Sequence, residues 1–440
     1  MSRYKPYPRY KESGVEWLEE VPEHWTLSKL KYILQSMISG GTPKTDKPSN
    51  WCESGTGTPW VSIADISRNY IISETKKDVT VEGIIEKGLK VLPKGTLLYS
   101  IFASLGKVAI ANTELTTNQA ILGLIPNKKM DNNFLYWLLV ALEDYVHFSA
   151  SSNTQDNLNS EKVANFPIVL PITEQTTIAN FLYRETAKID TLIAKQERLI
   201  VLLAEKRQTL ISHAVTKGLD PNVKMKDSGV EWLGEVPEHW KLPKLALLTT
   251  RIGDGLHGTP NYIDNSDYSF INGNNFINGK IILKSSTKHI SKEEYIKNFK
   301  PLDSSTLLLS INGTIGNLAF YDQEKIMLGK SAAYINCNHL VKREYLYYFI
   351  QSSHNKVYFD LELTGTTIYN LSLESIRRTP ITLPPIDEQR KIIDYLNIKT
   401  QRIDTLTEKA KQAITLLKER RTALISAAVT GKIDVRGESI

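Results

Sequence analysis

The feature that most constrains this 440-residue sequence is an internal duplication. The segment KESGVEWLEEVPEHWTLSKL, Lys11–Leu30, returns as Lys226–Leu245 with 16 identities in 20 positions. A second match, without gaps and at an offset of 214 residues, aligns Glu174–Asp220 with Glu388–Asp434. Two copies are too few for a solenoid, so the duplication predicts two similar units in a pseudo-two-fold arrangement.

The second pair of matched segments has the pattern of long helices. Alternating steps of three and four residues between apolar positions are typical of a coiled-coil seam. Both segments lack Pro and Gly until Gly218 and Gly431, which indicate C-terminal ends. Separate solvated helices on two cores are the alternative, but two matching seams in one chain favour antiparallel pairing. The seam positions are Leu182, Ile189, Leu192, Leu199, Leu203 and Leu210, and Ile392, Leu396, Ile403, Leu406, Leu417 and Leu424.

The sequence between the matched segments diverges, over about 35–165 and 250–378. Short β-rich runs such as TPWVSIADI (58–66) are separated by Gly, Asn and Pro turns, and one helix is expected in each half, at 131–149 and 342–360. The predicted fold class is α/β, with two similar domains of mixed α/β structure joined by the two long helices. The expected division is a domain at 1–170, a helical spacer at 171–220, a domain at 221–382 and a spacer at 383–440.

Composition and charge restrict the function only loosely. The net charge of +6 and the pI near 8.9 permit a nucleic-acid partner without requiring one. Cys52 and Cys337 have no metal-type spacing, which fits a reducing compartment. The N-terminus lacks the apolar core of a signal peptide, and the longest apolar run, Phe134–Leu142, is about half of a membrane span. We expect a cytoplasmic protein.

Sequence motifs of catalysis are missing. There is no P-loop, no H-E-x-x-H, no G-x-S-x-G and no Asn-Pro-Pro-Tyr of the kind found in adenine methyltransferases. The glycine-rich stretch Gly253–Asn261 lacks the Rossmann spacing and is interpreted as a turn rather than a phosphate-binding loop. His24 and His239 lie in the repeated text and are interpreted as packing or capping residues rather than general bases. No catalytic residue and no metal ligand is predicted.

Polar loops at matching places in the two halves are the candidate binding elements. Side-chain amides can contact adenine edges, Lys can contact guanine, and Gly-rich turns and hydroxyl groups suit phosphates. Asn, Gly and Thr also simply favour turns, but recurrence in both halves favours DNA contact. The predicted DNA-binding residues are Thr42, Lys44, Ser104, Lys107, Asn118, Gln119 and Thr154, and His257, Thr259, Asn274, Asn312, Thr314, Lys330, Thr366, Thr367 and Tyr369. Trp17, Trp25, Trp232 and Trp240 are predicted packing anchors or partner contacts.

Three pieces of text carry a family resemblance. SGVEWLGEVPEHW (Ser228–Trp240), ITLPPIDEQ (Ile381–Gln389) and ERRTALISAAVTGKID (Glu419–Asp434) resemble the specificity subunit of bacterial type I restriction-modification systems. The resemblance covers essentially the whole chain. It implies two target-recognition domains, each recognising one half of a split and asymmetric DNA sequence, which an antiparallel coiled coil holds apart.

The resemblance also implies partners and cofactors. The expected partners are double-stranded DNA, two methyltransferase (modification) subunits and two restriction (helicase-nuclease) subunits, with no membrane. The assembly would methylate adenine N6 with S-adenosylmethionine, or cut DNA with ATP and Mg²⁺, through the partner subunits, and this chain would bind no cofactor. A self-contained restriction or methylation enzyme is one alternative, which the missing motifs oppose. A coiled-coil scaffold without a nucleic-acid role is another, but it leaves the paired polar loops unexplained.

Overall fold

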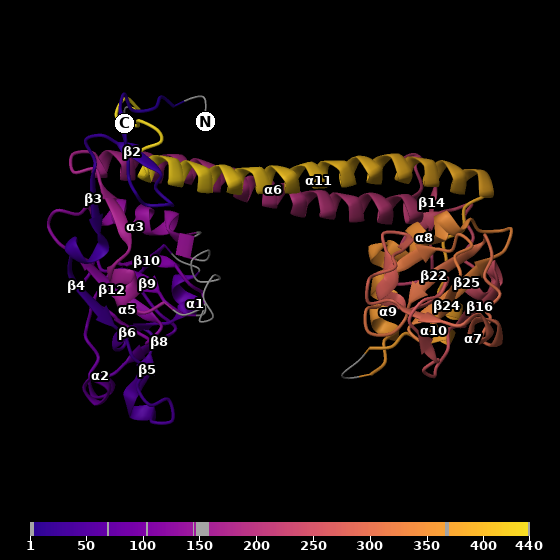
Figure 1. The fold of residues 1–440 in the computed structure, drawn as a ribbon. Coiled ribbons are helices and arrows are strands. Elements are labelled where there is room, and N and C mark those ends of the chain that lie inside the picture. The colour runs from indigo at the N-terminus through magenta and orange to yellow at the C-terminus, as the bar shows by residue number, and fades with distance from the viewer. Residues whose placement is uncertain are drawn as a thin grey trace. The chain divides into compact units, whose positions relative to one another are not determined.

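The computed structural model describes residues 4–67, 70–102, 104–143, 145–146, 158–365 and 369–438. The chain forms two compact units: unit 1 comprises Met1–Gln196 with Gln412–Ile440, and unit 2 comprises Glu197–Lys411. The division falls inside the two longest helices, α6 (Gln175–Lys217) and α11 (Ile386–Val429), which Figure 1 labels. Each unit is therefore built from one α/β domain and a part of both long helices.

Among the described residues, unit 1 contains two sheets of four or more strands, which are mainly antiparallel, and two sheets of two strands. The larger has the strand order β4 (Leu34–Ser39), β12 (Ile121–Pro126), β9 (Leu97–Ser100), β10 (Val108–Ala111) and β7 (Ile71–Ile72). The smaller has the order β11 (Thr116–Thr117), β6 (Thr58–Val61), β8 (Lys77–Val79) and β5 (Trp51–Glu53). The two-stranded sheets are β1 (Tyr10–Glu12) with β2 (Glu20–Pro22), and β13 (Pro167–Leu170) with β3 (Thr26–Lys29). The remaining elements are α1 (Ile63–Ile66), α2 (Val81–Lys87), α3 (Asn132–Ala141) and α5 (Ser160–Ala164).

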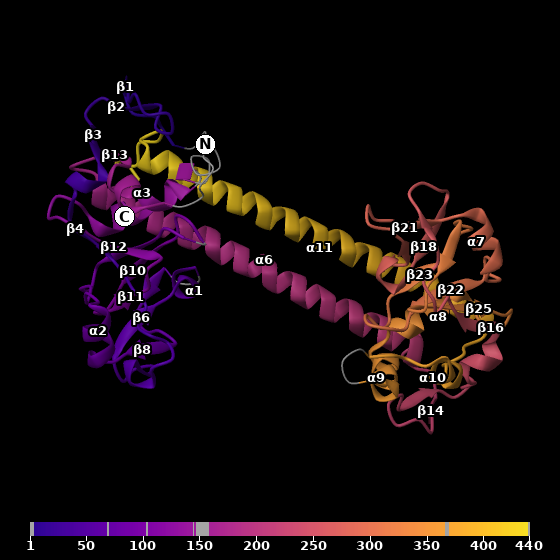
Figure 2. The same ribbon diagram turned by 60° about the horizontal axis from the view of Figure 1, so that its bottom comes forward.

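Unit 2 repeats this plan, and its central strands lie side by side in Figures 1 and 2. The first sheet has the order β16 (Thr249–Asp254), β25 (Ala332–Cys337), β22 (Thr306–Ser310) and β23 (Leu318–Phe320). The second has the order β17 (Tyr262–Ile263), β21 (Lys288–Ile290), β18 (Tyr268–Ile271) and β24 (Ile326–Leu328). The other elements are β14 (Met225–Asp227), β15 (Glu235–Pro237), β19 (Phe276–Ile277), β20 (Lys280–Ile281), α7 (Lys292–Lys297), α8 (Arg343–Gln351), α9 (Ser353–Glu362) and α10 (Leu373–Arg378).

Two expected elements are wrong in detail. The single helix expected at 342–360 is two helices, because Ser352 adopts an extended backbone (ψ 150°) and its side chain caps α9 by accepting a hydrogen bond from the backbone NH of Asn355. The β-rich run at 58–66 is a strand only as far as Val61. Ser62 and Asp65 then form a capping box that starts α1. In both segments, a capping side chain determines where a helix begins.

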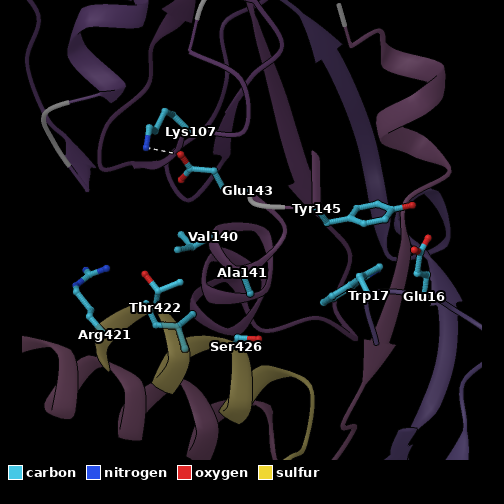
Figure 3. Close-up of a pocket in the computed structure, with 11 residues that line it drawn as sticks. Glu16, Trp17, Lys107, Val140, Ala141, Glu143, Tyr145, Arg421, Thr422 and Ser426 are labelled. Carbon is cyan, nitrogen blue, oxygen red and sulfur yellow. Dashed lines mark hydrogen bonds and ion pairs between the residues drawn. The ribbon is translucent and has the colours of Figure 1, made fainter. Parts of the chain in front are cut away.

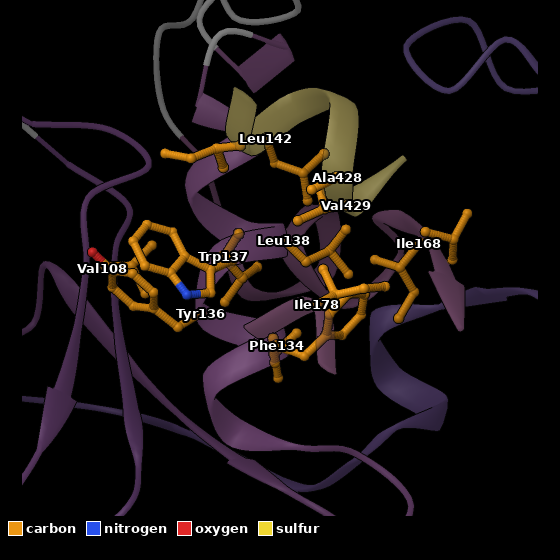
Figure 4. Close-up of a cluster of buried hydrophobic side chains, with 14 of the residues drawn as sticks. Val108, Phe134, Tyr136, Trp137, Leu138, Leu142, Ile168, Ile178, Ala428 and Val429 are labelled. Atoms are coloured by element: carbon orange, nitrogen blue, oxygen red, sulfur yellow. The ribbon is translucent and has the colours of Figure 1, made fainter. Parts of the chain in front are cut away.

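The core of unit 1 surrounds α3, whose side chains are apolar on almost every side. Phe134 and Leu138 are fully buried, and they lie among side chains from β13, α6 and the last turns of α11 (Figure 4). Ile178 of α6 and Val429 of α11 belong to the same cluster. Burying each such side chain contributes about 1.5–3 kcal/mol. The first turns of α6 and the last turns of α11 are therefore integral to the unit 1 core.

Ion pairs and helix ends show how the long helices run. In unit 1, Arg421 of α11 contacts Asp190 of α6; in unit 2, Arg207 of α6 contacts Asp404 of α11. In each pair, an early residue of one helix meets a late residue of the other, so the helices are antiparallel within each unit, as the seam predicts. Gly218 follows the end of α6 with φ +79°, a conformation that favours glycine.

The predicted seam is only partly buried. Leu182, Ile189 and Leu203 have exposed fractions of at most 7%. Leu192 is 45% exposed, and Leu406, its counterpart in the second copy, is 43% exposed. The 4–3 spacing therefore identifies the helices and their pairing but overstates the continuity of the apolar contact. In the described part of the chain, no helix is long and apolar enough to cross a membrane.

Candidate nucleic-acid interface

The first copy of the repeated text attaches the unit 1 domain to both long helices. His24 Nε2 lies 2.6 Å from Glu174 Oε1, just before α6 begins, and the Tyr7 hydroxyl donates to the other oxygen of the same buried carboxylate. Trp25 is fully buried and packs beside Gly431, past the end of α11. The segment therefore contacts the start of one helix and the end of the other.

The second copy makes the same attachment in unit 2. His239 Nε2 lies 2.8 Å from Glu388 Oε2 in the first turn of α11, and Trp240 Nε1 donates to that oxygen at 3.1 Å. Trp240 is fully buried next to Gly218, past the end of α6. Each histidine thus contacts a glutamate at the start of a long helix, Glu174 or Glu388. This shared contact explains why the repeated text is the same in two domains that otherwise differ.

The other two tryptophans of the repeat are half-buried. Trp232 stacks on Tyr358 with ring centroids 5.3 Å apart. Trp17 lies 6.1 Å from the ring of Tyr145 and lines a cavity of about 610 Å³ beside α3 and the last turns of α11 (Figure 3). All four tryptophans therefore pack against their own unit.

Three charged residues that line the unit 1 cavity, Lys107, Glu143 and Arg421, make ion pairs. Lys107 Nζ lies 2.5 Å from Glu143 Oε1, as the dashed line in Figure 3 marks. Arg421, on the opposite side, binds Asp190 and stacks over Trp137 at 5.9 Å. The Lys107–Glu143 and Arg421–Asp190 pairs are thus contacts within unit 1.

Among the described residues, no group of His, Cys, Asp and Glu side chains could hold a metal ion. Burial raises the pKa of Cys337 to about 12, so its thiol stays protonated.

The hairpin after β9 has the same framework as the hairpin after β22. In unit 1, Ser100 NH donates to the Lys107 carbonyl at 2.9 Å, and Lys107 NH donates to Ser100 Oγ at 2.9 Å. In unit 2, Ser310 and Asn317 make the same two bonds, both 2.8 Å long. Lys107 and Asn317 are thus equivalent positions, and Ser104 is equivalent to Thr314.

A three-residue turn, 118–120 in unit 1 and 329–331 in unit 2, is also held identically. Asn118 NH donates to the Val61 carbonyl at 3.0 Å, and Gly329 NH donates to the Ile271 carbonyl at 2.8 Å. The carbonyl of the third residue accepts from Ile101 NH at 2.9 Å in unit 1 and from Ile311 NH at 3.0 Å in unit 2. We call these segments the recognition turns. Their middle residues, Gln119 and Lys330, are equivalent and exposed.

The loops after β4 and β16 lie against the recognition turns. Gly40 NH donates to the Ile121 carbonyl at 3.2 Å, and Gly255 NH donates to the Ala332 carbonyl at 3.1 Å. A Cβ atom at Gly40 would lie 2.2 Å from the Asn118 carbonyl oxygen, so only glycine fits there. Thr42 and His257 are consequently equivalent positions. The sequence match between GGTP (Gly40–Pro43) and HGTP (His257–Pro260) is out of register with this equivalence by two residues.

The structure brings some of the residues predicted in unit 1 together. The Thr42 hydroxyl donates to Gln119 Oε1, and Asn118 Oδ1 accepts from Ala120 NH at 3.0 Å. Ser104 belongs to the adjoining hairpin. Lys44 is exposed, with its Nζ 4.0 Å from Glu86, and Lys107 is paired as described above. Thr154 lies outside the described residues.

Three of the residues predicted in unit 2, His257, Thr314 and Lys330, lie at the equivalent positions described above. His257 Nε2 lies 2.6 Å from Asp254 Oδ2, and Asn312 Nδ2 donates to Asn370 Oδ1 at 3.3 Å. Asn274 is exposed in the turn after β18. Thr259, Thr314, Lys330 and Tyr369 are exposed as well, and Thr366 and Thr367 lie outside the described residues.

Two tryptophans that the sequence analysis did not select support the unit 1 loop. Trp60 Nε1 donates to the Gly41 carbonyl at 2.9 Å, and Trp51 Nε1 donates to the Lys44 carbonyl at 3.1 Å. Their rings meet edge to face at 5.0 Å. One sequence signal could have identified them. Both tryptophans lie outside the repeated text and shortly after the predicted loop that contains Thr42 and Lys44.

Comparison with protein families agrees with a chain built from two similar units. The model of the type I restriction modification DNA specificity domain matches residues 22–200 and 256–416, most of the chain, and the chain belongs to this family. It is a specificity subunit of a type I restriction-modification system, which recognises DNA sequence and is not itself an enzyme.

Individual relatives match over nearly their whole length. The specificity subunit of the type I restriction enzyme MjaIX of Methanocaldococcus jannaschii is 23% identical over 99% of both chains. The specificity subunit of the putative enzyme MjaX of the same organism is 26% identical, covering 97% of this chain and 98% of the relative. A chain solved in work on complex assembly and conformational transition of the type I R-M system has a TM-score of 0.66 and 17% identity, covering 95% and 99%. That structural likeness shows the shared fold.

Proposed function

We propose that each unit recognises one half of an asymmetric, split DNA site. The observation that carries this proposal is a shared loop framework with different side chains at equivalent positions. Gln119 corresponds to Lys330, and Thr42 corresponds to His257. Hydrogen-bonding groups of different kinds favour different base edges in the major groove. Two units of one fold would therefore select two different base sequences.

The long helices fit a role in fixing the gap between the two half-sites. Each helix begins in the core of one unit and ends in the core of the other. The number of helical residues between the two cores would then set the number of unread base pairs.

Exposed leucines on the long helices support the binding of two modification subunits. Leu202 of α6 is 44% exposed, and Leu416, which occupies the same position of the repeat in α11, is 64% exposed. Leu192 and Leu406 form a second equivalent exposed pair. Exposed apolar side chains on a charged helix are typical of protein-protein contacts. Their duplication fits two copies of the modification subunit, which would use S-adenosylmethionine for methylation. Two restriction subunits of the same assembly would use ATP and Mg²⁺ for cleavage, and the proposed location of the assembly is the cytoplasm.

Mapping of methylated adenines tests this function. The full chain would be produced with its modification subunits in a host lacking other adenine methyltransferases, and the genomic DNA sequenced for N6-methyladenine. The expected result is one split motif with two unlike halves. Recovery of a continuous motif, or of methylation without sequence preference, would contradict the proposal.

A further inference from the structure

The recognition turns place one variable side chain on an otherwise fixed support. In unit 1, backbone bonds to Val61 and Ile101 hold the first and third residues, and Ala120 NH binds the side chain of Asn118. Gln119, between them, is exposed. The turn can therefore change its middle side chain without loss of these contacts.

The turn of unit 2 is held as firmly by different means. Ser331 Oγ donates to Asn272 Oδ1 at 2.9 Å and accepts from Gly273 NH at 3.1 Å. A Cβ atom at Gly329 would lie 2.3 Å from Asn272 Oδ1, so a larger residue there would have to displace the side chain of Asn272. Lys330 is exposed between these residues. The same geometry therefore presents an ammonium group in unit 2 where it presents an amide in unit 1.

Thr42 orients the Gln119 amide. The Thr42 hydroxyl donates to Gln119 Oε1, which keeps a second lone pair, and the Nε2 group keeps its two donors. An amide in this state can accept from the N6 amino group of adenine and donate to its N7. Lys330 is exposed, and a lysine ammonium can donate to O6 and N7 of guanine.

We propose that Gln119 and Lys330 are equivalent base-contacting residues, one in each unit. Gln119 selects adenine, and Lys330 selects guanine, at the same place of the respective half-site. Thr42 is a positioning residue that sets the amide of Gln119. This inference rests on the proposed function, because it presupposes that each unit recognises one half-site.

The test is methylation mapping of single variants of the full chain in complex with its modification subunits. Gln119→Lys should change the preference from adenine to guanine at one position of one half-site, by about tenfold or more. Lys330→Gln should make the opposite change in the other half-site. In each variant the second half-site stays as in the unmodified chain. Lys292→Gln, which removes a charge from exposed α7, is the matched control and should leave both half-sites unchanged.

A second pair of variants separates positioning from contact. Thr42→Val should relax the selection of adenine at the base affected by Gln119→Lys, and Thr42→Ser should restore it. If Gln119→Lys abolishes methylation, the methylation map of Gln119→Ala tests the assignment instead. Loss of base preference at a single position of the half-site would support it. A split motif unchanged at every base in the Gln119 and Lys330 variants would overturn it, while leaving the bipartite function intact. Absence of a split motif in the unmodified chain would instead contradict the proposed function.

Discussion

Arg421 Nε lies 2.9 Å from Asp190 Oδ1, and this contact joins the end of α11 to the early part of α6 within unit 1. Arg207 and Asp404 make the reciprocal contact in unit 2 at 3.4 Å. The two contacts come from the same two pieces of repeated text, with donor and acceptor exchanged between the helices. The repeat therefore encodes one interaction that is used twice.

The Arg421–Asp190 pair should contribute little to stability by itself. Both side chains are substantially exposed, and such pairs contribute about 0.2–1 kcal/mol. Arg421→Met should lower the free energy of unfolding somewhat more than Asp190→Asn, because Arg421 also stacks over Trp137. A double-mutant cycle measured by denaturant unfolding gives the coupling. A coupling energy above about 2 kcal/mol would contradict this assignment.

The core around α3 should dominate the stability of unit 1. Phe134→Ala removes a fully buried ring and should cost about 3–5 kcal/mol. Ile85→Ala, at a side chain that is 74% exposed on α2, is the control and should stay within about 0.5 kcal/mol of the unmodified protein. Thermal unfolding checks both values, and equal effects would show that α3 is not central to the core.

The contribution of Asp434 to the stability of unit 1 should be lost at acidic pH. The Arg436 side chain beside Asp434 holds the pKa of that carboxyl below its ordinary value of 3.8. A carboxyl with a lowered folded-state pKa adds stability above its unfolded pKa, and this stability is lost as the pH falls through the folded value. Asp434→Asn should therefore reduce stability at pH 6 and have no effect well below pH 3.8. Unfolding midpoints measured across this range would show a pH-independent difference if the assignment were wrong.

Lengthening the helices should change the gap of the recognised site and leave the half-sites unchanged. One heptad inserted in α6 between Ile189 and Leu203, with one at the equivalent place in α11, adds about 10 Å to each helix. This length corresponds to about 3 bp of DNA at about 3.4 Å each. Methylation mapping gives the result directly, and altered bases with an unchanged gap would be evidence against the helices as the spacer.

The sequence predicted the large features of the fold because they depend on repetition and periodicity. The duplicated text identified two units, and the apolar spacing identified α6 and α11 with their ends at Gly218 and Gly431. Sequence spacing could not show that Leu192 and Leu406 are exposed, because their burial depends on how far the helices separate in three dimensions.

The candidate interface was predicted only as a set of loops. Polar composition indicated the loops around Thr42, Gln119 and Lys330, but composition does not distinguish a contacting side chain from one that holds the loop. The equivalence of Gln119 and Lys330 rests on backbone hydrogen bonds between strands remote in sequence. Trp51 and Trp60 were missed for the same reason, since composition does not show that their indole NH groups donate to carbonyls of the loop that contains Gly41 and Lys44.

The central claim is that two units with one framework recognise two different half-sites. The most direct measurement replaces residues 250–378 by residues 35–165, so that both units carry the same recognition loops, and maps the adenines that the resulting assembly methylates. The account predicts a split palindrome in which the half-site of unit 1 appears twice as an inverted repeat. An assembly that keeps its fold and partners but still methylates the original asymmetric motif would contradict it.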